Sequence, residues 1–279
     1  MKVMTTNSAW PQTTPPWVMG ILNVTPDSFS DGGRFCSVDD AVAHARKLIE
    51  EGADIIDVGG ESTRPGSQPV TEREQLDRVV PVIKAIRKLS EIPISIDTTR
   101  AAVARAAFDA GAGWVNDVSA LRDDPDIAVF AASSNCPVVL MHMLGEPRTM
   151  QANPHYDDVV REVCGFLMQR AELAQSVGVL RENIVFDPGV GFGKTLEHNL
   201  ALLNQLPHLV ALGYPILVGA SRKSFIGQLT GLPVEQRLEG SLAAAVLAVQ
   251  AGAQIIRVHD VGPTKRALAV ATAITTCSS

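Results

Sequence analysis

The sequence predicts a single-domain α/β protein, a (β/α)8 barrel of the TIM type, and three observations support this fold class. Eight short apolar runs recur along the 279 residues, and each ends at or near a polar or charged residue. Helix-like segments separate the runs, with apolar residues spaced three and four apart, as at Val79, Val82 and Ile86. The runs are nearly continuous, which is typical of parallel strands covered on both faces. A chain of this length fits one such barrel.

The eight apolar runs are the predicted strands. In chain order they are 18–23 (VMGILN), 54–58 (DIIDV), 92–97 (IPISID), 113–117 (GWVND), 137–142 (PVVLMH), 183–187 (NIVFD), 214–223 (YPILVGASRK) and 254–259 (QIIRVH). Strand, helix and strand repeat without an intervening linker, which favours a closed barrel. An open, doubly wound sheet is the alternative that the same order of elements allows.

The segments between the strands carry the start and stop signals of helices. Glycine within a small-residue phrase, which suits the left-handed position after a helix, precedes four strands, at 51–54 (EGAD), 110–113 (AGAG), 211–214 (ALGY) and 251–254 (AGAQ). Thr71 with Glu74 is a capping-box pattern. Ser37 with Asp40 is a second one. Pro263 suits the first turn of the last helix.

Two segments that follow predicted strands are long, residues 25–37 and 59–71. In a (β/α)8 barrel the segments after the strands build the active site, and long ones commonly close over a substrate. We expect lids here because each segment combines glycines with bulky or charged residues. Phe29 and Asp31 lie in the first segment, and Arg64 lies in the second.

The remaining organisation is simple. Residues 17–279 are predicted to form the barrel, and residues 1–16 an N-terminal tail that is poorly ordered. The tail lacks the apolar core of a secretory signal. Four widely separated cysteines without a CxxC pair indicate thiols of a reducing cytosol rather than a zinc or redox site. We therefore expect a cytoplasmic protein.

Charge and hydropathy exclude several classes of partner. The net charge is −6 and no block of lysine and arginine occurs, so we expect no nucleic-acid partner and no anionic membrane surface. A local cationic pocket for a small anion stays possible. No apolar run reaches the roughly 18 residues that a membrane helix requires.

Several familiar catalytic motifs are absent. The sequence has no G-x-S-x-G nucleophile elbow and no HExxH zinc motif. His142, between two methionines, is interpreted as structural rather than as a copper ligand. The stretch 188–195 (PGVGFGKT) resembles a phosphate loop but fits neither the Walker pattern nor the dinucleotide pattern. Its glycines are interpreted as allowing a sharp turn after Asp187.

Seven polar groups remain at the predicted strand ends and lids. Groups that suit a phosphate or diphosphate are Arg64, Lys223, Arg257 and His259. Groups that suit the N–H edge of a flat polar heterocycle are Asp97, Asn116 and Asp187. Each one alone has a structural explanation, as a helix cap or a rim ion pair, but their convergence at one barrel mouth favours a binding site. Asp57 and His142 are interpreted as structural.

This combination indicates a reaction type. A diphosphate-sized anion site that faces a heterocycle site, without a covalent nucleophile, suggests displacement of a diphosphate by positioning and charge stabilisation. The segment Ser221–Ser224 follows a strand and opens a helix, so its backbone N–H groups add to the anion site. Mg²⁺ would normally accompany the phosphates, held by few protein oxygens, and Asn23 is a candidate ligand.

Eight motifs, in order and with plausible spacing from about residue 17 to about residue 270, resemble the dihydropteroate synthase family. They are MGILNVTPDSFSDGG (19–33), GGESTRPGS (59–67), SIDTTR (95–100), NDVSA (116–120), MHMLGEPRTMQ (141–151), FDPGVGFGK (186–194), SRKSF (221–225) and IIRVHDV (255–261). One motif would be moderate support, and eight collinear motifs are strong support.

The resemblance implies a (β/α)8 barrel, a homodimer, and a transferase of folate biosynthesis. Its reaction joins 4-aminobenzoate to 6-hydroxymethyl-7,8-dihydropterin diphosphate and gives 7,8-dihydropteroate and diphosphate. The family's pterin pocket falls on Asp97, Asn116, Asp187, Lys223 and Arg257. Its diphosphate site falls on Asn23, Arg257 and His259, with Mg²⁺ at Asn23. Its 4-aminobenzoate pocket, which is also the pocket for sulfonamide inhibitors, falls on Phe29, Thr63, Pro65, Lys223 and Ser224.

The residues themselves agree with a dissociative displacement of diphosphate. The dihydropterin ring can delocalise positive charge at the methylene carbon as diphosphate leaves, and Asp97 is the candidate that stabilises this cation. The amine of 4-aminobenzoate is already nucleophilic, so it needs no strong base. Loop closure would exclude water, which would otherwise capture the cation. Asp31 and Arg64 of the lids join Asp97 and Lys223 as expected catalytic residues.

Two other hypotheses remain open. Another pterin-binding barrel, such as a methyltetrahydrofolate methyltransferase, would share the acceptors Asp97, Asn116 and Asp187. It would need neither the two long lids nor the anion site at Arg257 and His259. A barrel that has lost activity and serves as a binding subunit is the non-enzyme alternative. The presence of Lys223 and of both lid motifs counts against it.

Overall fold

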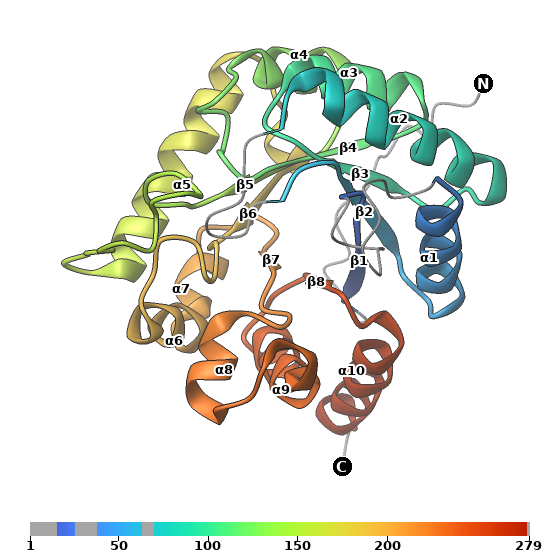
Figure 1. The fold of residues 1–279 in the computed structure, drawn as a ribbon. Helices are drawn as coiled ribbons and strands as arrows, with labels where there is room; N and C mark the ends of the chain where they lie inside the picture. The colour runs from blue at the N-terminus through green and yellow to red at the C-terminus, as the bar shows by residue number, and fades with distance from the viewer. Residues whose placement is uncertain (1–15, 26–37, 63–69, 278–279) are drawn as a thin grey trace.

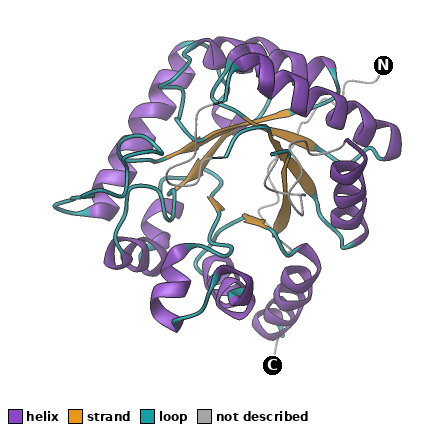
Figure 2. Ribbon diagram, viewed as in Figure 1, coloured by secondary structure: helices purple, strands orange, loops and turns teal. Residues whose placement is uncertain are grey.

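The computed structural model describes residues 16–25, 38–62 and 70–277, and these form one α/β domain with parallel strands surrounded by helices (Figures 1 and 2). The strands follow one another in the order β6-β5-β4-β3-β2-β1-β8-β7. A parallel bridge between Phe186 and Ile216 joins the first strand of this order to the last. The sheet is therefore closed into the predicted barrel, and the open doubly wound alternative is wrong.

The strands are β1 (Trp17–Asn23), β2 (Ile55–Gly59), β3 (Ile94–Asp97), β4 (Trp114–Asp117), β5 (Val138–Met141), β6 (Ile184–Asp187), β7 (Leu217–Val218) and β8 (Ile255–Val258). The helices are α1 (Val38–Glu50), α2 (Glu72–Leu89), α3 (Ala101–Asp109), α4 (Asp126–Ser134), α5 (Val159–Ser176), α6 (Leu196–Asn204), α7 (Leu206–Val210), α8 (Ser224–Thr230), α9 (Leu238–Gln250) and α10 (Val261–Thr276). Short 3₁₀ turns occupy Arg181–Asn183 and Val234–Gln236. No helix of the described residues is long and apolar enough to span a membrane.

Every predicted strand is present, and only β7 is much shorter than its predicted range of 214–223. Pro215, just before β7, has no N–H to donate to a neighbouring strand. Beyond the strand, Arg222 has a φ of 57°, a left-handed conformation that breaks an extended chain. The predicted residues Ser221 and Lys223 therefore lie in a turn after the strand rather than on it.

The predicted helix signals also hold where they are described. The glycines of the four small-residue phrases, Gly52, Gly111, Gly213 and Gly252, all have positive φ. Thr71 caps α2, and its hydroxyl accepts a hydrogen bond from the backbone N–H of Glu74 in a capping box. Pro263 lies in the first turn of α10. Ser37 lies outside the described residues, as does all of the predicted tail except Pro16.

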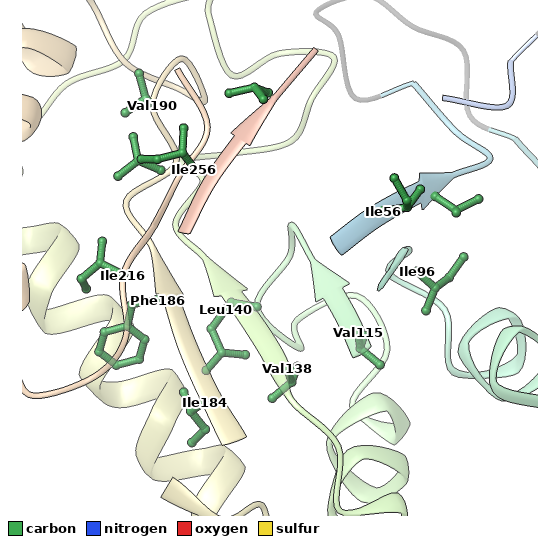
Figure 3. Packing of buried hydrophobic residues seen from close by; sticks show 14 of the residues in the cluster. Ile56, Ile96, Val115, Val138, Leu140, Ile184, Phe186, Val190, Ile216 and Ile256 are labelled. Atoms are coloured by element: carbon green, nitrogen blue, oxygen red, sulfur yellow. The ribbon is translucent and has the colours of Figure 1, made fainter. Parts of the chain in front are cut away.

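Successive strand residues alternate between the helices and the barrel interior, as the pleat of a strand requires. Outward-facing residues belong to the large core shared with the helices, and Figure 3 shows part of it, including Ile56, Val115 and Leu140. The inward-facing residues nearest the strand starts form a separate apolar cluster, made of Met19, Ile55, Trp114, Val139, Val185, Leu217 and Ile255. This cluster is the floor of the barrel.

The next inward-facing position along each strand is two residues further on, and several of these positions are polar. On β2 it is Asp57, two residues after Ile55, and on β4 it is Asn116, two residues after Trp114. On β6 and β8 the same step leads to Asp187 and Arg257. The pleat therefore places a polar layer directly above the apolar floor, toward the strand ends.

Candidate active site

A cavity of about 1160 Å³ opens at the C-terminal ends of the strands. Every described residue of the predicted site lines it, namely Asn23, Asp97, Asn116, Asp187, Lys223, Ser224, Arg257 and His259. These residues come from strands and turns distributed around the barrel, so the fold brings them together as expected. The other predicted site residues, Phe29, Asp31, Thr63, Arg64 and Pro65, lie outside the described residues.

The guanidinium of Arg257 lies between two carboxylates. Its Nε donates to Asp57 Oδ2 at 2.6 Å, and one terminal nitrogen donates to Asp97 Oδ2 at 2.7 Å. Asn116 also donates to Asp57 Oδ2, at 3.0 Å. Asp57 thus contacts two of the predicted site residues, which the interpretation of Asp57 as simply structural did not foresee. The period-two pattern of β2, which puts residues 55, 57 and 59 on one face, is the signal that would have found it.

Asp97 closes β3 and is positioned to change its protonation near neutral pH. Burial raises the pKa of Asp97 to about 7. The adjacent Arg257 opposes this rise in pKa, whereas the Asp57 carboxylate adds to it. The register of β3 pairs Asp97 with Gly59 of β2 on one side and with Asn116 of β4 on the other. Pairing with both neighbouring strands therefore fixes the backbone of Asp97 at the cavity wall.

Asp187 closes β6, and the turn that follows keeps its carboxylate in place. The backbone N–H of Gly189 donates to Asp187 Oδ1 at 2.7 Å. Gly189 has a φ of 67°, and a side chain there would collide with the backbone carbonyl of His142. The predicted sharp turn after Asp187 is therefore confirmed. Burial raises the pKa of Asp187 to about 6, while the Gly189 N–H opposes the rise.

Lys194 lines the cavity and was not among the predicted site residues. Its ammonium donates to the carbonyl of Phe192 at 2.9 Å and contacts His142 Nδ1 at 2.9 Å. Burial lowers the pKa of Lys194 to about 7 and that of His142 to about 2. His142 is therefore neutral and accepts a hydrogen bond, so it serves Lys194 rather than a metal. Lys194 lies in the stretch that fits neither phosphate-loop pattern, so its sequence context gave no reason to place it in the site.

Lys223 follows the left-handed Arg222 and precedes the first residue of α8, Ser224. Its ammonium lies 3.9 Å from the centre of the Phe192 ring, a cation–π contact. Arg222 points elsewhere, and its guanidinium donates two hydrogen bonds to the Asp260 carboxylate, at 2.9 and 2.6 Å. This ion pair ties the turn after β7 to the turn after β8, and so fixes the backbone that carries Lys223.

His259 follows β8 and contributes a neutral side chain. Its Nδ1 lies 3.1 Å from the hydroxyl oxygen of Ser221. Burial lowers the pKa of His259 to about 3, and the nearby charge of Arg257 is the next largest cause. At neutral pH the imidazole can donate a hydrogen bond to an anion but supplies no charge. Among the described residues of the predicted anion site, the positive charge therefore comes from Arg257 and Lys223.

A small open space separates Asn23 from Asp97 at the ends of β1 and β3. Gly59 lies between them, and a Cβ on it would come within 3.6 Å of Asn23 Oδ1 and 3.4 Å of Asp97 Cβ. Among the described residues, no three His, Cys, Asp or Glu side chains group as a metal cage. The donor set here is therefore one amide oxygen and a nearby carboxylate, which fits a cation that keeps waters or phosphates as its other ligands.

Comparison with known proteins decides what this site belongs to. The family model described as pterin binding enzyme matches residues 19–259. The dihydropteroate synthase of Haemophilus influenzae is 50% identical over 255 residues, which are 91% of this chain and 92% of that protein. The chain belongs to the dihydropteroate synthase family.

Solved structures of dihydropteroate synthases agree with this assignment. The Xanthomonas albilineans enzyme with 4-aminobenzoic acid is 51% identical, has a TM-score of 0.89, and is matched over 94% of each chain. The Yersinia pestis enzyme in a sulfonamide drug complex is 47% identical with a TM-score of 0.89, over 94% of this chain and 95% of that one. The predicted family, barrel fold and transferase class are confirmed. The matches decide against a methyltransferase, and they place the chain among transferases rather than among inactive binding subunits.

Proposed function

We propose that this dihydropteroate synthase joins 4-aminobenzoate to 6-hydroxymethyl-7,8-dihydropterin diphosphate, giving 7,8-dihydropteroate and diphosphate. One observation carries the proposal: a single cavity is lined by the acceptors Asp97, Asn116 and Asp187 and by the donors Lys223 and Arg257. A dihydropterin offers ring N–H groups to acceptors, and a diphosphate requires donors and positive charge.

In this proposal the dihydropterin ring binds to the acceptors on β3, β4 and β6. Asp97, Asn116 and Asp187 receive its N–H groups, and Lys223 and Arg257 donate to its oxygen and ring nitrogen atoms. Buried carboxylates in such a site are strong acceptors, because their hydrogen bonds are not weakened by competing water. Ile21, Val190 and Phe192 also line the cavity and offer apolar surface to a flat ring.

The reaction is a dissociative substitution. The bond between the methylene carbon and the diphosphate oxygen breaks first, and its electron pair leaves with diphosphate. The ring stabilises the resulting cation, and the Asp97 carboxylate stabilises it further through its charge. The amine nitrogen of 4-aminobenzoate then forms the new bond to carbon and loses a proton to solvent. Asp31 and Arg64, outside the described residues, are proposed to exclude water in this step.

Diphosphate is proposed to bind Arg257 and His259, with Mg²⁺ held by Asn23. The amide oxygen of Asn23 and the carboxylate of Asp97 both lie near Gly59, which has no side chain to separate them, and such oxygen donors suit a hard cation. When bound, Mg²⁺ would neutralise charge on the leaving group. Arg257 would contribute positive charge to the diphosphate, and the neutral His259 would contribute a hydrogen bond.

4-Aminobenzoate is proposed to bind at the outer part of the cavity, between Lys223, Ser224 and the two lids. The lid residues of this pocket are Phe29, Thr63 and Pro65, which lie outside the described residues. Relatives support the proposal, because one was solved with 4-aminobenzoic acid and another in a sulfonamide drug complex. A sulfonamide should therefore compete with 4-aminobenzoate for this chain.

The chain is further proposed to act as a homodimer in the cytoplasm. Helices α9 and α10 pack side by side on the outside of the barrel (Figure 1). Leu247, Val270 and Ile274 on these helices are 64%, 61% and 71% exposed, which is unusual for large aliphatic side chains. A second copy of the chain would cover them. The described cysteines, Cys136, Cys164 and Cys277, are free thiols, in keeping with a reducing compartment.

Product formation tests the proposed reaction. Purified protein is incubated with the dihydropterin diphosphate and radiolabelled 4-aminobenzoate, with MgCl₂ or with EDTA, and labelled dihydropteroate is separated by chromatography. We expect labelled product with Mg²⁺, little with EDTA, and competition by a sulfonamide. Absence of product at saturating substrates would show that the chain is an inactive barrel. Full activity in EDTA would contradict only the role of Mg²⁺.

A further inference from the structure

Asp57 lies inside the barrel, beneath the residues that line the cavity, and it joins strands that are not neighbours. Its side chain is 0% exposed. Its Oδ2 atom accepts from Arg257 on β8 at 2.6 Å and from Asn116 on β4 at 3.0 Å. In the order of the sheet, β4 and β8 are each two strands away from β2, on opposite sides. One carboxylate oxygen therefore ties together both sides of the site.

Stability alone does not explain a carboxylate at this position. Desolvating a buried ion pair cancels most of its attraction, and apolar side chains of similar shape commonly replace such pairs without loss of stability. The adjoining floor, which contains Ile55, shows that apolar side chains fill this part of the barrel. The second oxygen of Asp57 is also buried without a hydrogen-bond partner among the described residues. Asp57 is therefore better explained by the groups that it holds.

We infer that Asp57 is a positioning residue of the reaction, which orients the Arg257 guanidinium and the Asn116 amide toward the substrate. This inference rests on the proposed function. Because the Asn116 amide nitrogen is engaged by Asp57, its carbonyl oxygen is the atom left to accept a pterin N–H. Because Arg257 Nε donates to Asp57 as well, this hydrogen bond restrains the orientation of the guanidinium. Two groups that bind the substrate are thus preorganised by one residue that does not line the cavity.

Asp57 also positions Asp97 through Arg257. The same guanidinium donates to Asp57 Oδ2 at 2.6 Å and to Asp97 Oδ2 at 2.7 Å. Holding Arg257 in place therefore also holds the Asp97 carboxylate at the cavity wall.

The test compares Asp57→Asn with Asp54→Asn and Asp57→Glu in the full-length protein. Asp54→Asn is the matched control. It removes a half-buried carboxylate that pairs with Lys265 at 2.6 Å. Asp54 lies just before the start of β2, at the end of the barrel opposite the cavity. For each folded variant we would measure binding of 6-hydroxymethyl-7,8-dihydropterin by its fluorescence, and kcat together with the KM for each of the two substrates. Asp57→Glu keeps the charge but moves the carboxylate by one methylene group.

For Asp57→Asn we expect a loss of about 10- to 100-fold in pterin affinity and in kcat/KM for the dihydropterin diphosphate, as hydrogen bonds to charged groups imply. The KM for 4-aminobenzoate should stay near that of the wild type, because its proposed pocket uses other residues. Asp57→Glu should also lose pterin affinity, and Asp54→Asn should match the wild type in both measurements. A folded Asp57→Asn with wild-type pterin affinity, or with equal increases in the two KM values, would overturn the inference. So would an unfolded Asp57→Asn together with a wild-type-like Asp57→Glu. The binding arm does not need turnover, so an inactive wild type would defeat the proposed reaction and still leave Asp57 testable.

Discussion

The ammonium of Lys223 lies in the cavity beside the Phe192 ring. Because Lys223 is at the barrel mouth rather than in the core, its substitution should change substrate binding without changing the fold. We expect Lys223→Ala to weaken dihydropterin binding by about 10- to 100-fold, because a hydrogen bond from a charged group contributes about 1.5–3 kcal/mol. Calorimetric titration measures the affinity, and circular dichroism should show an unchanged fold. Lys47→Ala, at an exposed position on α1, is the control. Equal affinities for the two variants would remove Lys223 from the site.

Asp97 and Asp187 make the reaction depend on pH. Burial raises the pKa of Asp97 to about 7 and that of Asp187 to about 6. Since stabilising a cation requires the Asp97 carboxylate in its charged form, kcat/KM should fall as the pH drops through about 7. Initial rates from about pH 5 to 9 give the profile. A flat acid side down to pH 5 would contradict the role of Asp97.

The same pKa values affect stability with a definite sign. The folded chain holds protons on Asp97 and Asp187 at pH values where an unfolded chain, with carboxyl pKa near 4, has released them. The folded state therefore binds more protons between about pH 4 and 7, so these two groups make the free energy of unfolding fall as the pH rises through that window. Carboxylates placed for catalysis thus reduce stability near neutral pH.

The site residues at the strand ends could be predicted from the sequence, whereas a residue lower on a strand and one in the turn beyond a strand could not. Asp97, Asn116 and Asp187 could be predicted because each ends an apolar run. Asp57 was interpreted as structural, although the pleat of β2 turns its side chain into the barrel interior, where the other site residues point. Lys194 was missed because its position depends on a turn built from glycines with positive φ, and no local pattern shows where such a turn aims a side chain.

At the scale of single elements, the turn after β7 is irregular but is held by several hydrogen bonds. Arg222 adopts a φ of 57° there, its backbone N–H donates to Ser241 at 2.9 Å, and its side chain pairs with Asp260. The carbonyls of Arg222 and Lys223 accept from Arg237 at 3.2 and 3.4 Å. A short strand followed by a clamped turn lets Lys223 reach the cavity while its backbone stays rigid.

Loosening this clamp should reduce activity without abolishing it. Asp260→Asn removes the ion pair with Arg222, which is partly exposed and therefore contributes only about 1 kcal/mol. We expect kcat/KM and dihydropterin affinity each to fall by about fivefold, because about 1 kcal/mol corresponds to that factor and Lys223 loses part of its fixed position. Asp77→Asn, which removes an exposed pair with Arg73 on α2, should leave the kinetics unchanged. Identical kinetics for the two variants would show that the clamp does not position Lys223.

The order and type of elements followed from the sequence almost completely, because each strand and helix carries its own periodicity and end signals. The length of β7 did not, since it depends on Pro215 and on a left-handed residue rather than on hydropathy. The two predicted lids fall largely on residues 26–37 and 63–69, outside the described part of the chain. Their role stays a prediction of the sequence.

At the scale of the whole molecule, the barrel is organised in layers along its axis. An apolar floor of inward-facing residues supports the polar layer that contains Asp57 and Arg257, and the cavity opens above it. The floor keeps water from the lower side of the site, so hydrogen bonds in the polar layer act in a medium of low polarity. Folding and catalysis therefore share the barrel interior but occupy different depths of it.

The outer surface of the barrel gives a prediction about assembly. Leu247→Glu combined with Ile274→Glu places charges on the exposed aliphatic positions of α9 and α10, which should convert a dimer into a monomer. Sedimentation velocity measures the state. Leu173→Glu on α5, also at an exposed leucine, is the control and should remain dimeric. A double variant that sediments like the control would place the dimer interface elsewhere.

The central claim is that one cavity binds both substrates and couples loss of diphosphate to formation of the carbon–nitrogen bond. Measuring diphosphate release and dihydropteroate formation in the same reaction, with Mg²⁺ and with or without 4-aminobenzoate, tests it most directly. We predict equal amounts of the two products when both substrates are saturating, and no sustained diphosphate release without 4-aminobenzoate. Steady release of diphosphate without the second substrate, or no release with it, would contradict the account.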